Sequence, residues 1–205
     1  MNDAVYTPAQ ASAVADLPLK AVHKLIDGRL IRPRRKRVGR EIQRFLSQDQ
    51  LVYLRLEAEG VRLLPLATRR EVAQAVANSP EIEMVRLSKG SAVTIQVKPV
   101  RREIKEQLLR LKKAQDMTAS DPEILRGTPV FRGTRIPVEL VAEMLADGAS
   151  VEEILKGYPA LDRNKVELAT LYVRAFPRRG RPSQRPWAGA KKPVGVPRHA
   201  KALAG

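Results

Sequence analysis

Apolar residues recur at helical spacing in three stretches near the start of the chain. The predicted helices cover residues 8–15, 18–27 and 47–59. Thr7 with Gln10, and Ser47 with Gln50, have the spacing of a capping box, in which each side chain bonds the other residue's backbone amide at a helix start. Gly28 is expected to end the second helix, because glycine tolerates the left-handed backbone that follows many helices.

A basic hairpin is predicted between the second and third helices. Residues 30–32 and 41–46 are short β-prone segments, and basic side chains fill the tip between them. The tip contains Arg34, Arg35, Lys36, Arg37, Gly39 and Arg40. The first two helices are joined only by a short turn at Asp16 and Leu17. The order helix, turn, helix, hairpin, helix therefore predicts a winged helix-turn-helix.

The remainder of the chain alternates helices with short strands. After the third helix we expect a helix over 68–77, begun by a Thr68/Glu71 capping box, strands at 84–87 and 92–97, and a mostly solvated helix over 100–115. Two β-prone pieces then surround Gly133. Three further helices follow, at residues 137–148, 150–157 and 162–176, and Ser150 with Glu153 forms a capping box for the second of them.

This pattern predicts a mainly α protein with short β-hairpins, in which a small C-terminal helical domain with helix-turn-helix-like helices follows the winged domain. Charge separates four segments. Residues 1–60, the winged domain, hold 11 basic and 7 acidic residues, and the connecting α/β segment 61–116 holds 12 and 6. The helical domain 117–176 holds 7 and 9, whereas the tail 177–205 holds 8 basic residues and no acid.

Composition narrows the classes of function. The 205 residues include 38 Lys and Arg against 22 Asp and Glu, a formal charge of +16, which favours a polyanionic partner such as nucleic acid. Cysteine is absent and the chain has two histidines, His23 and His199, so we expect no metal site and no cofactor. No apolar run has the length of a membrane span and the start does not resemble a signal peptide, so we expect a cytoplasmic protein with no membrane partner.

Three motifs mark the winged segment, namely Tyr6-Thr7-Pro8, Gly28-Arg29-Leu30-Ile31-Arg32-Pro33 and Arg44-Phe45-Leu46-Ser47. They give residues 5–58 a resemblance to the MerR and excisionase type of winged helix-turn-helix. It implies that the second helix enters the major groove and that the hairpin contacts the DNA backbone or the minor groove. The candidate DNA-binding residues are Lys20, His23, Lys24, Arg32, Arg34, Arg35, Lys36, Arg37 and Arg40.

The alternative interpretation of these residues is an ordinary solvated surface. A surface that serves solubility normally mixes the two signs of charge. Between Arg29 and Arg44, however, the chain has eight basic residues and a single acid, Glu41. That imbalance favours contacts with phosphates.

Four motifs follow one another between residues 119 and 176. They are Asp121-Pro122-Glu123-Ile124-Leu125, Gly127-Thr128-Pro129-Val130-Phe131, Gly133-Thr134-Arg135-Ile136-Pro137-Val138, and Gly148 to Leu155. Through these motifs, residues 119–176 resemble the bacterial family called domain of unknown function 433. This resemblance implies a VapB-like antitoxin, whose partner is a PIN-domain ribonuclease toxin. We also expect a homodimer through the hairpin around Gly133, since exposed strand edges invite pairing with a second copy.

The basic tail is the candidate toxin-binding segment. Its composition cannot bury enough apolar surface to fold alone, and it holds the only tryptophan of the chain. An arginine from it could pair with the carboxylates of a nuclease active site. The candidate residues are Arg178, Arg179, Arg181, Arg185 and Trp187. A nonspecific phosphate-binding tail and a plain disordered end are the two alternatives.

These observations predict an antitoxin of a type II toxin-antitoxin system, which binds its own operator DNA and neutralises a ribonuclease toxin. A stand-alone MerR-like transcriptional regulator is the alternative, and a nucleoid-associated protein a third class. No serine, histidine and acid are plausibly grouped and no glycine-rich phosphate loop occurs, so we do not expect an enzyme.

Overall fold

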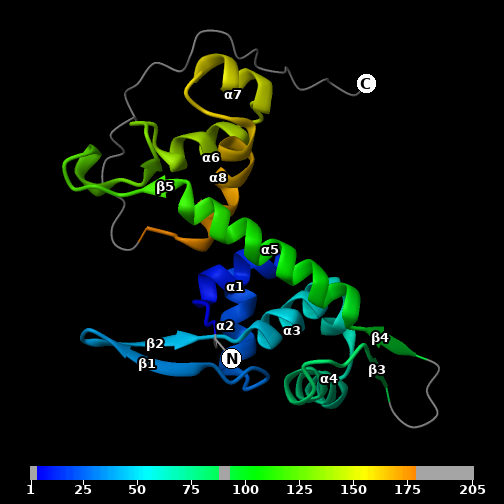
Figure 1. Cartoon of the computed structure of the whole chain (residues 1–205). Coiled ribbons are helices and arrows are strands. Elements are labelled where there is room, and N and C mark those ends of the chain that lie inside the picture. The colour runs from blue at the N-terminus through cyan, green and yellow to red at the C-terminus, as the bar shows by residue number, and fades with distance from the viewer. Residues whose placement is uncertain (1–3, 88–92, 179–205) are drawn as a thin grey trace, which may run out of the picture. The chain divides into compact units, whose positions relative to one another are not determined.

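The computed structural model describes residues 4–87 and 93–178, and the chain forms two compact units. The first comprises Met1–Lys113 with Arg174–Pro177, and the second comprises Ala114–Val173 with the chain from Arg178 onward. Both are built mainly from helices, with short antiparallel strand pairs between them (Figure 1). This confirms the predicted class, a mainly α protein with short β-hairpins.

The first two helices meet at a sharp turn. Helix α1 is Pro8–Ala15 and helix α2 is Leu19–Asp27. The capping box predicted at Thr7 is present, with the Gln10 amide donating to the Thr7 hydroxyl at 3.3 Å and the Thr7 amide donating to the Gln10 side chain at 2.8 Å. Asp16 adopts a left-handed backbone, φ 51°, between the helices. The turn is therefore short, as the sequence predicts.

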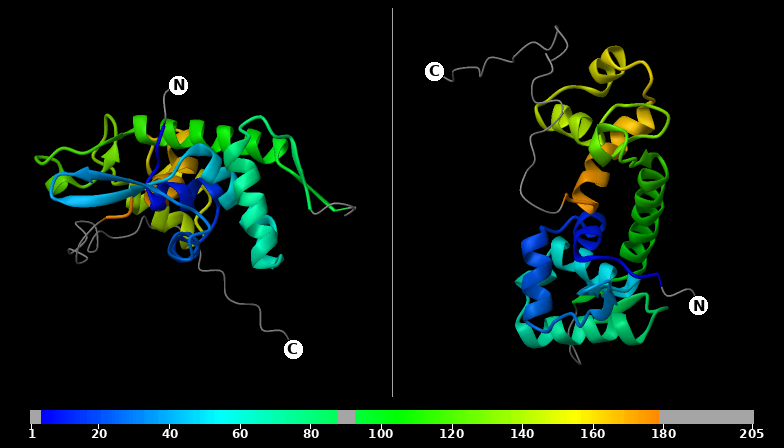
Figure 2. Two further views of the ribbon diagram at one scale, coloured as in Figure 1. Left: turned by 90° about the horizontal axis from the view of Figure 1, so that it is seen from below. Right: turned by 90° about the vertical axis from the view of Figure 1, so that its left-hand side faces the viewer.

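The hairpin strands begin later than the sequence pattern suggested. Strand β1 is Arg34–Val38 and strand β2 is Glu41–Phe45, so the predicted strand at residues 30–32 is wrong. Residues 30 and 31 instead close the end of α2, because both of their amides donate to the Leu25 carbonyl. Pro33 has no N–H to contribute to a strand, so pairing starts after it. Figures 1 and 2 show the β1–β2 ribbon projecting beyond the helices of its unit.

The rest of the first unit contains α3 (Gln48–Glu59), the short 3₁₀ helix Val61–Leu63, α4 (Leu66–Asn78), β3 (Met84–Arg86), β4 (Thr94–Gln96) and most of α5 (Lys98–Asp116). The Ser47/Gln50 box is confirmed. The Thr68/Glu71 box is wrong, because α4 begins two residues earlier after Pro65, without a side-chain cap. Helix α5 is mostly exposed to solvent, as predicted, and it buries an apolar stripe that includes Val100, Ile104 and Leu111.

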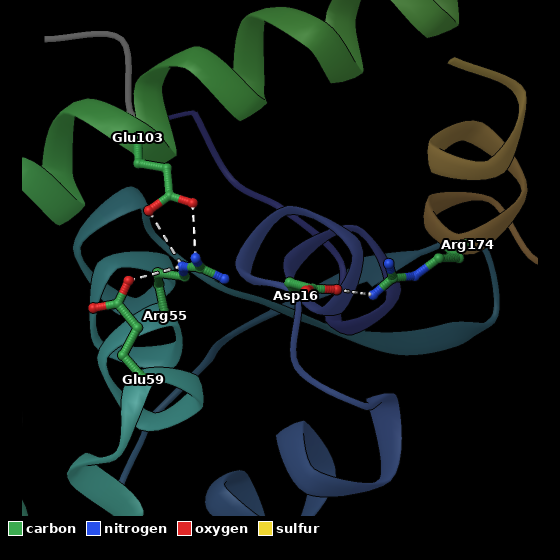
Figure 3. A network of polar contacts seen from close by, with 5 residues as sticks. All are labelled: Asp16, Arg55, Glu59, Glu103 and Arg174. Carbon is green, nitrogen blue, oxygen red and sulfur yellow. Dashed lines mark hydrogen bonds and ion pairs between the residues drawn. The ribbon is translucent and has the colours of Figure 1, made fainter. Parts of the chain in front are cut away.

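Ion pairs around Arg55 and around Glu57 connect α3 to its neighbours in the first unit. Arg55 bonds Glu59 one turn along the helix at 3.1 Å and Glu103 of α5 at 2.9 Å (Figure 3). Glu57, only 2% exposed, accepts a hydrogen bond from the Tyr53 hydroxyl and two from Arg69 of α4, the latter two each at 2.9 Å. The buried carboxylate is thus fully paired, as a charge removed from water must be.

The second unit packs three helices over a short strand pair. Strands β5 (Thr118–Ala119) and β6 (Val130–Phe131) are antiparallel, and the 3₁₀ helix Leu125–Gly127 lies between them. The helices are α6 (Val138–Ala146), α7 (Val151–Gly157) and α8 (Arg163–Ala175). Their core contains Phe131, Val141, Ile154 and Val166. The Ser150/Glu153 box is confirmed at the start of α7.

Replacing the buried carboxylate should destabilise the first unit. We expect Glu57→Ala to lower the free energy of unfolding by about 3–5 kcal/mol, because it leaves the Arg69 charge and the Tyr53 hydroxyl without a partner. Glu59→Ala is the matched control on the same helix and should cost less than about 1 kcal/mol, since exposed pairs contribute little. Urea unfolding followed by circular dichroism measures both. Equal losses of unfolding free energy in the two variants would show that the buried Glu57 cluster stabilises the unit no more than an exposed ion pair does.

Alkaline pH should weaken the same cluster. Burial raises the pKa of Tyr53 above its ordinary value of 10.0, and the hydrogen bond to Glu57 raises it further. A tyrosine whose pKa is raised by folding contributes stability that is complete below about pH 10 and is lost as the pH rises beyond it. The stability advantage of the native chain over Tyr53→Phe should therefore shrink steadily above pH 10. A constant difference between the two unfolding midpoints would contradict this.

Candidate nucleic-acid interface

Helix α2 presents a polar face to solvent. Val22, Leu25 and Ile26 are buried in the first unit. Lys20, His23 and Lys24 are exposed on the remaining surface of the helix. The three residues predicted to reach a DNA groove therefore lie together on one helix, and their side chains are accessible.

The β1–β2 ribbon exposes nearly all of its basic residues. All five residues of β1 are exposed, and its register pairs Arg35 with Arg44 and Arg37 with Ile42. Side chains alternate between the two faces of a strand. Arg35, Arg37 and Arg44 consequently share one face of the ribbon, whereas Arg34 and Lys36 of β1 share the other.

Contacts at its base fix the ribbon to the helices of its unit. The Arg44 guanidinium donates to Asp27 at the end of α2 at 2.9 Å. Tyr6 and Leu46 exchange backbone hydrogen bonds of 2.9 and 2.8 Å, which add the N-terminal segment to the foot of β2. The Arg44–Asp27 pair thus connects the basic ribbon to the end of α2, the helix that carries the exposed basic face.

Every predicted DNA-binding residue lies in the first unit and is exposed, and each is on α2, on β1, in the α2–β1 connection or in the hairpin turn. Those nine are Lys20, His23, Lys24, Arg32, Arg34, Arg35, Lys36, Arg37 and Arg40. Two further arginines were missed. Arg29 and Arg44 line a cleft of about 530 Å³ with Arg32 and Arg35. The eight basic residues counted between Arg29 and Arg44 in the sequence include both of them. The count does not reveal which of these side chains line the same cleft.

The predicted toxin-binding residues are described only at their start. Arg178 is exposed and donates to the Thr128 hydroxyl at 2.8 Å, and it lies 3.6 Å from the Glu139 carboxylate. Both partners belong to the second unit. Arg179, Arg181, Arg185 and Trp187 lie outside the described residues.

The arginines of the second-unit hairpin differ in role. Arg132 donates to the backbone carbonyls of Asp116 and Thr118 at 2.9 and 3.3 Å, so it fixes the fold beside β5. Arg135 is exposed. Strand β6 is already paired with β5, and Val130 also forms a bridge with Pro137.

In the described part of the chain, no helix is both long enough and apolar enough to cross a membrane.

Comparisons with known proteins match only part of the chain. A protein of Sinorhizobium fredii (strain NBRC 101917 / NGR234), described as uncharacterized protein y4eO, is 47% identical over 89 residues. That stretch is 43% of this chain and 40% of the relative, so the likeness spans less than half of either protein. No solved structure matches the chain significantly. Residues 119–173 match the family described as protein of unknown function DUF433, which confirms the family resemblance for this segment.

Proposed function

We propose that the protein is a DNA-binding antitoxin whose first unit binds the operator of its own operon through a winged helix-turn-helix. The observation that carries the DNA-binding part is the Arg44–Asp27 pair, which holds the arginine-rich ribbon against the end of α2. An exposed basic helix face beside an exposed basic ribbon suits simultaneous contact with a groove and the flanking phosphates. A homodimer of the chain would place two such units on a palindromic operator.

The antitoxin part of the proposal rests on the second unit and the tail. The DUF433 match covers 119–173, and the VapB-like role comes from the resemblance of that family. The tail beyond Arg178 is basic and free of acidic residues, so it complements the carboxylate cluster that a PIN-type nuclease uses to hold its metal. The proposed division of labour is operator binding by the first unit and toxin neutralisation by the second unit with its tail.

A stand-alone MerR-like regulator is the second candidate. The contacts of Arg178 with Thr128 and Glu139 favour it, because the first arginine of the tail is engaged within its own unit. The two candidates share the DNA interface and differ only in the second partner. A nucleoid-associated protein would also bind DNA, but without preference for one operator.

Neutralising the ribbon should weaken DNA binding. We expect Arg34, Arg35 and Arg37 replaced together by alanine to lower affinity for the operator duplex by about 10- to 1,000-fold, and to reduce the slope of log affinity against log salt by up to about 3. The matched control replaces Arg62, Arg86 and Arg102, which are exposed in the same unit and lie on the 3₁₀ helix, on β3 and on α5, outside the predicted interface. Fluorescence anisotropy across a salt series measures both. Equal affinities for the two variants would remove the ribbon from the interface.

Removing the tail should abolish toxin neutralisation and leave operator binding specific. The full chain is co-expressed with the protein encoded beside it, and ribonuclease activity is compared with that of a chain lacking residues 179–205, which retains the Arg178 contacts. Trp187→Ala tests the aromatic anchor separately from the charge. We expect activity to be suppressed only by the full chain. A neighbour that is no nuclease, or suppression that survives truncation, would contradict the tail mechanism and favour the stand-alone regulator.

A further inference from the structure

A cleft lies between the end of α2 and the β1–β2 ribbon. It has a volume of about 530 Å³, and four arginines line it, together with a single acidic residue, Asp27. These arginines are Arg29, Arg32, Arg35 and Arg44. They come from the α2–β1 connection and from both strands, so the fold gathers charges that are up to 15 positions apart in the sequence. We call this cavity the arginine cleft.

The arginine cleft has a fixed floor. Ile26 and Ile31 line it and are 7% and 3% exposed, so its base belongs to the core. The side-chain amide of Gln50 donates to the Arg32 carbonyl at 2.8 Å, and its side-chain oxygen accepts from the Ser47 amide at the start of α3. The connection that carries Arg29 and Arg32 therefore has hydrogen bonds both to α2, which it closes, and to α3.

The charge inside the arginine cleft is poorly balanced. Asp27 is engaged by Arg44 at 2.9 Å. In the part of the chain that the structure describes, no hydrogen bond or ion pair engages the side chains of Arg29, Arg32 and Arg35. Three guanidinium groups thus face a shared space with their donors available. Guanidinium groups donate paired hydrogen bonds in a geometry that matches phosphate oxygens.

Two features of the arginine cleft lower the stability of the folded protein when nothing is bound. Arg29 has φ 59°, in the left-handed region where glycine or asparagine is usual. It closes α2 in a Schellman arrangement, since its amide donates to Ile26 and the Leu30 amide donates to Leu25, yet Gly28 stands one position too early to relieve the strain. Arg35 and Arg44 are direct cross-strand partners, and like charges in that position repel. Of these two costs, the repulsion between Arg35 and Arg44 is the one that an anion in the cleft would offset.

We propose that the arginine cleft binds one phosphate of the DNA backbone, and that Arg29 is a phosphate-contacting residue of the interface. This inference rests on the proposed DNA binding and adds Arg29 and Arg44 to it. A phosphodiester would supply the negatively charged partner for the three guanidinium groups that no described residue engages. Because the contact is with the backbone, it fixes the position of the duplex and carries no sequence preference of its own.

Arg29→Gly separates this role from a structural one. Glycine suits the left-handed position, so the variant should unfold at the same temperature as the native chain or at a higher one. Its affinity for the duplex should nevertheless fall about 5- to 10-fold, and the salt slope should fall by about 1, because one phosphate contact is lost. Random duplex DNA should show the same loss as the operator duplex. A residue with only a structural role would change affinity and stability in the same direction.

The chain contains its own matched control. Arg126 is also a left-handed arginine, φ 55°, and it is exposed in the second unit. Arg126→Gly removes the same charge and relieves the same kind of strain outside the arginine cleft. We expect it to retain native affinity. Arg29→Asn, which also tolerates a left-handed backbone, gives a second variant should Arg29→Gly fold poorly.

The outcomes distinguish the two proposals. Loss of affinity in Arg29→Gly but not in Arg126→Gly supports the phosphate site. If these two variants have equal affinity while the ribbon triple variant loses affinity, the phosphate-binding role of the arginine cleft is overturned. The proposal that the first unit binds DNA then still stands. Failure of the native chain to bind duplex DNA overturns the proposed function itself. Loss confined to the operator duplex would mean that Arg29 contacts a base and would also overturn the phosphate assignment.

Discussion

The end of helix α2 determines where the basic ribbon begins and what surrounds it. The Leu25 carbonyl accepts from both the Leu30 and Ile31 amides, and Ile31 turns into the core. The chain cannot start a strand while its amides close the helix, and Pro33 delays pairing further. Arg29, Arg32 and the strand residues after them are consequently brought around one cavity.

Local signals in the sequence predicted local structure well and failed where tertiary contacts compete with them. Three capping boxes, at Thr7, Ser47 and Ser150, are formed because their side chains satisfy amides of the same helix turn. The Thr68/Glu71 spacing is identical, yet α4 starts at Leu66, since Pro65 is well placed just before a helix and the Arg69 side chain is drawn to buried Glu57. The contact between Glu57, Tyr53 and Arg69 joins two helices and leaves no periodic signal in either.

The same distinction applies to the candidate interface. The nine residues predicted from charge and helix face are all exposed. For Lys20, His23 and Lys24 the reason is the amphipathic spacing of α2, which determines the side that is buried. Arg29 and Arg44 could be added to the candidate interface only once the β1–β2 register and the Schellman closure of α2 were known. These two features place residues 15 positions apart at one cavity. Sequence spacing therefore indicates which segment is basic, whereas the pairing of Arg35 with Arg44 decides how the charges converge.

The arginines of the first unit differ in whether a carboxylate neutralises their charge. Arg44 has Asp27, and Arg55 has two carboxylates, so these side chains can hold the fold in the absence of any partner. Within residues 4–87 and 93–178, no carboxylate pairs with Arg29 or Arg35, and both line the cavity that Arg44 also lines, where like charges repel. That repulsion lowers the stability of the free protein and is removed when an anion enters. Stability lost in the free state thus becomes affinity in the bound state, and it also makes binding depend on salt, because small anions compete for the same space.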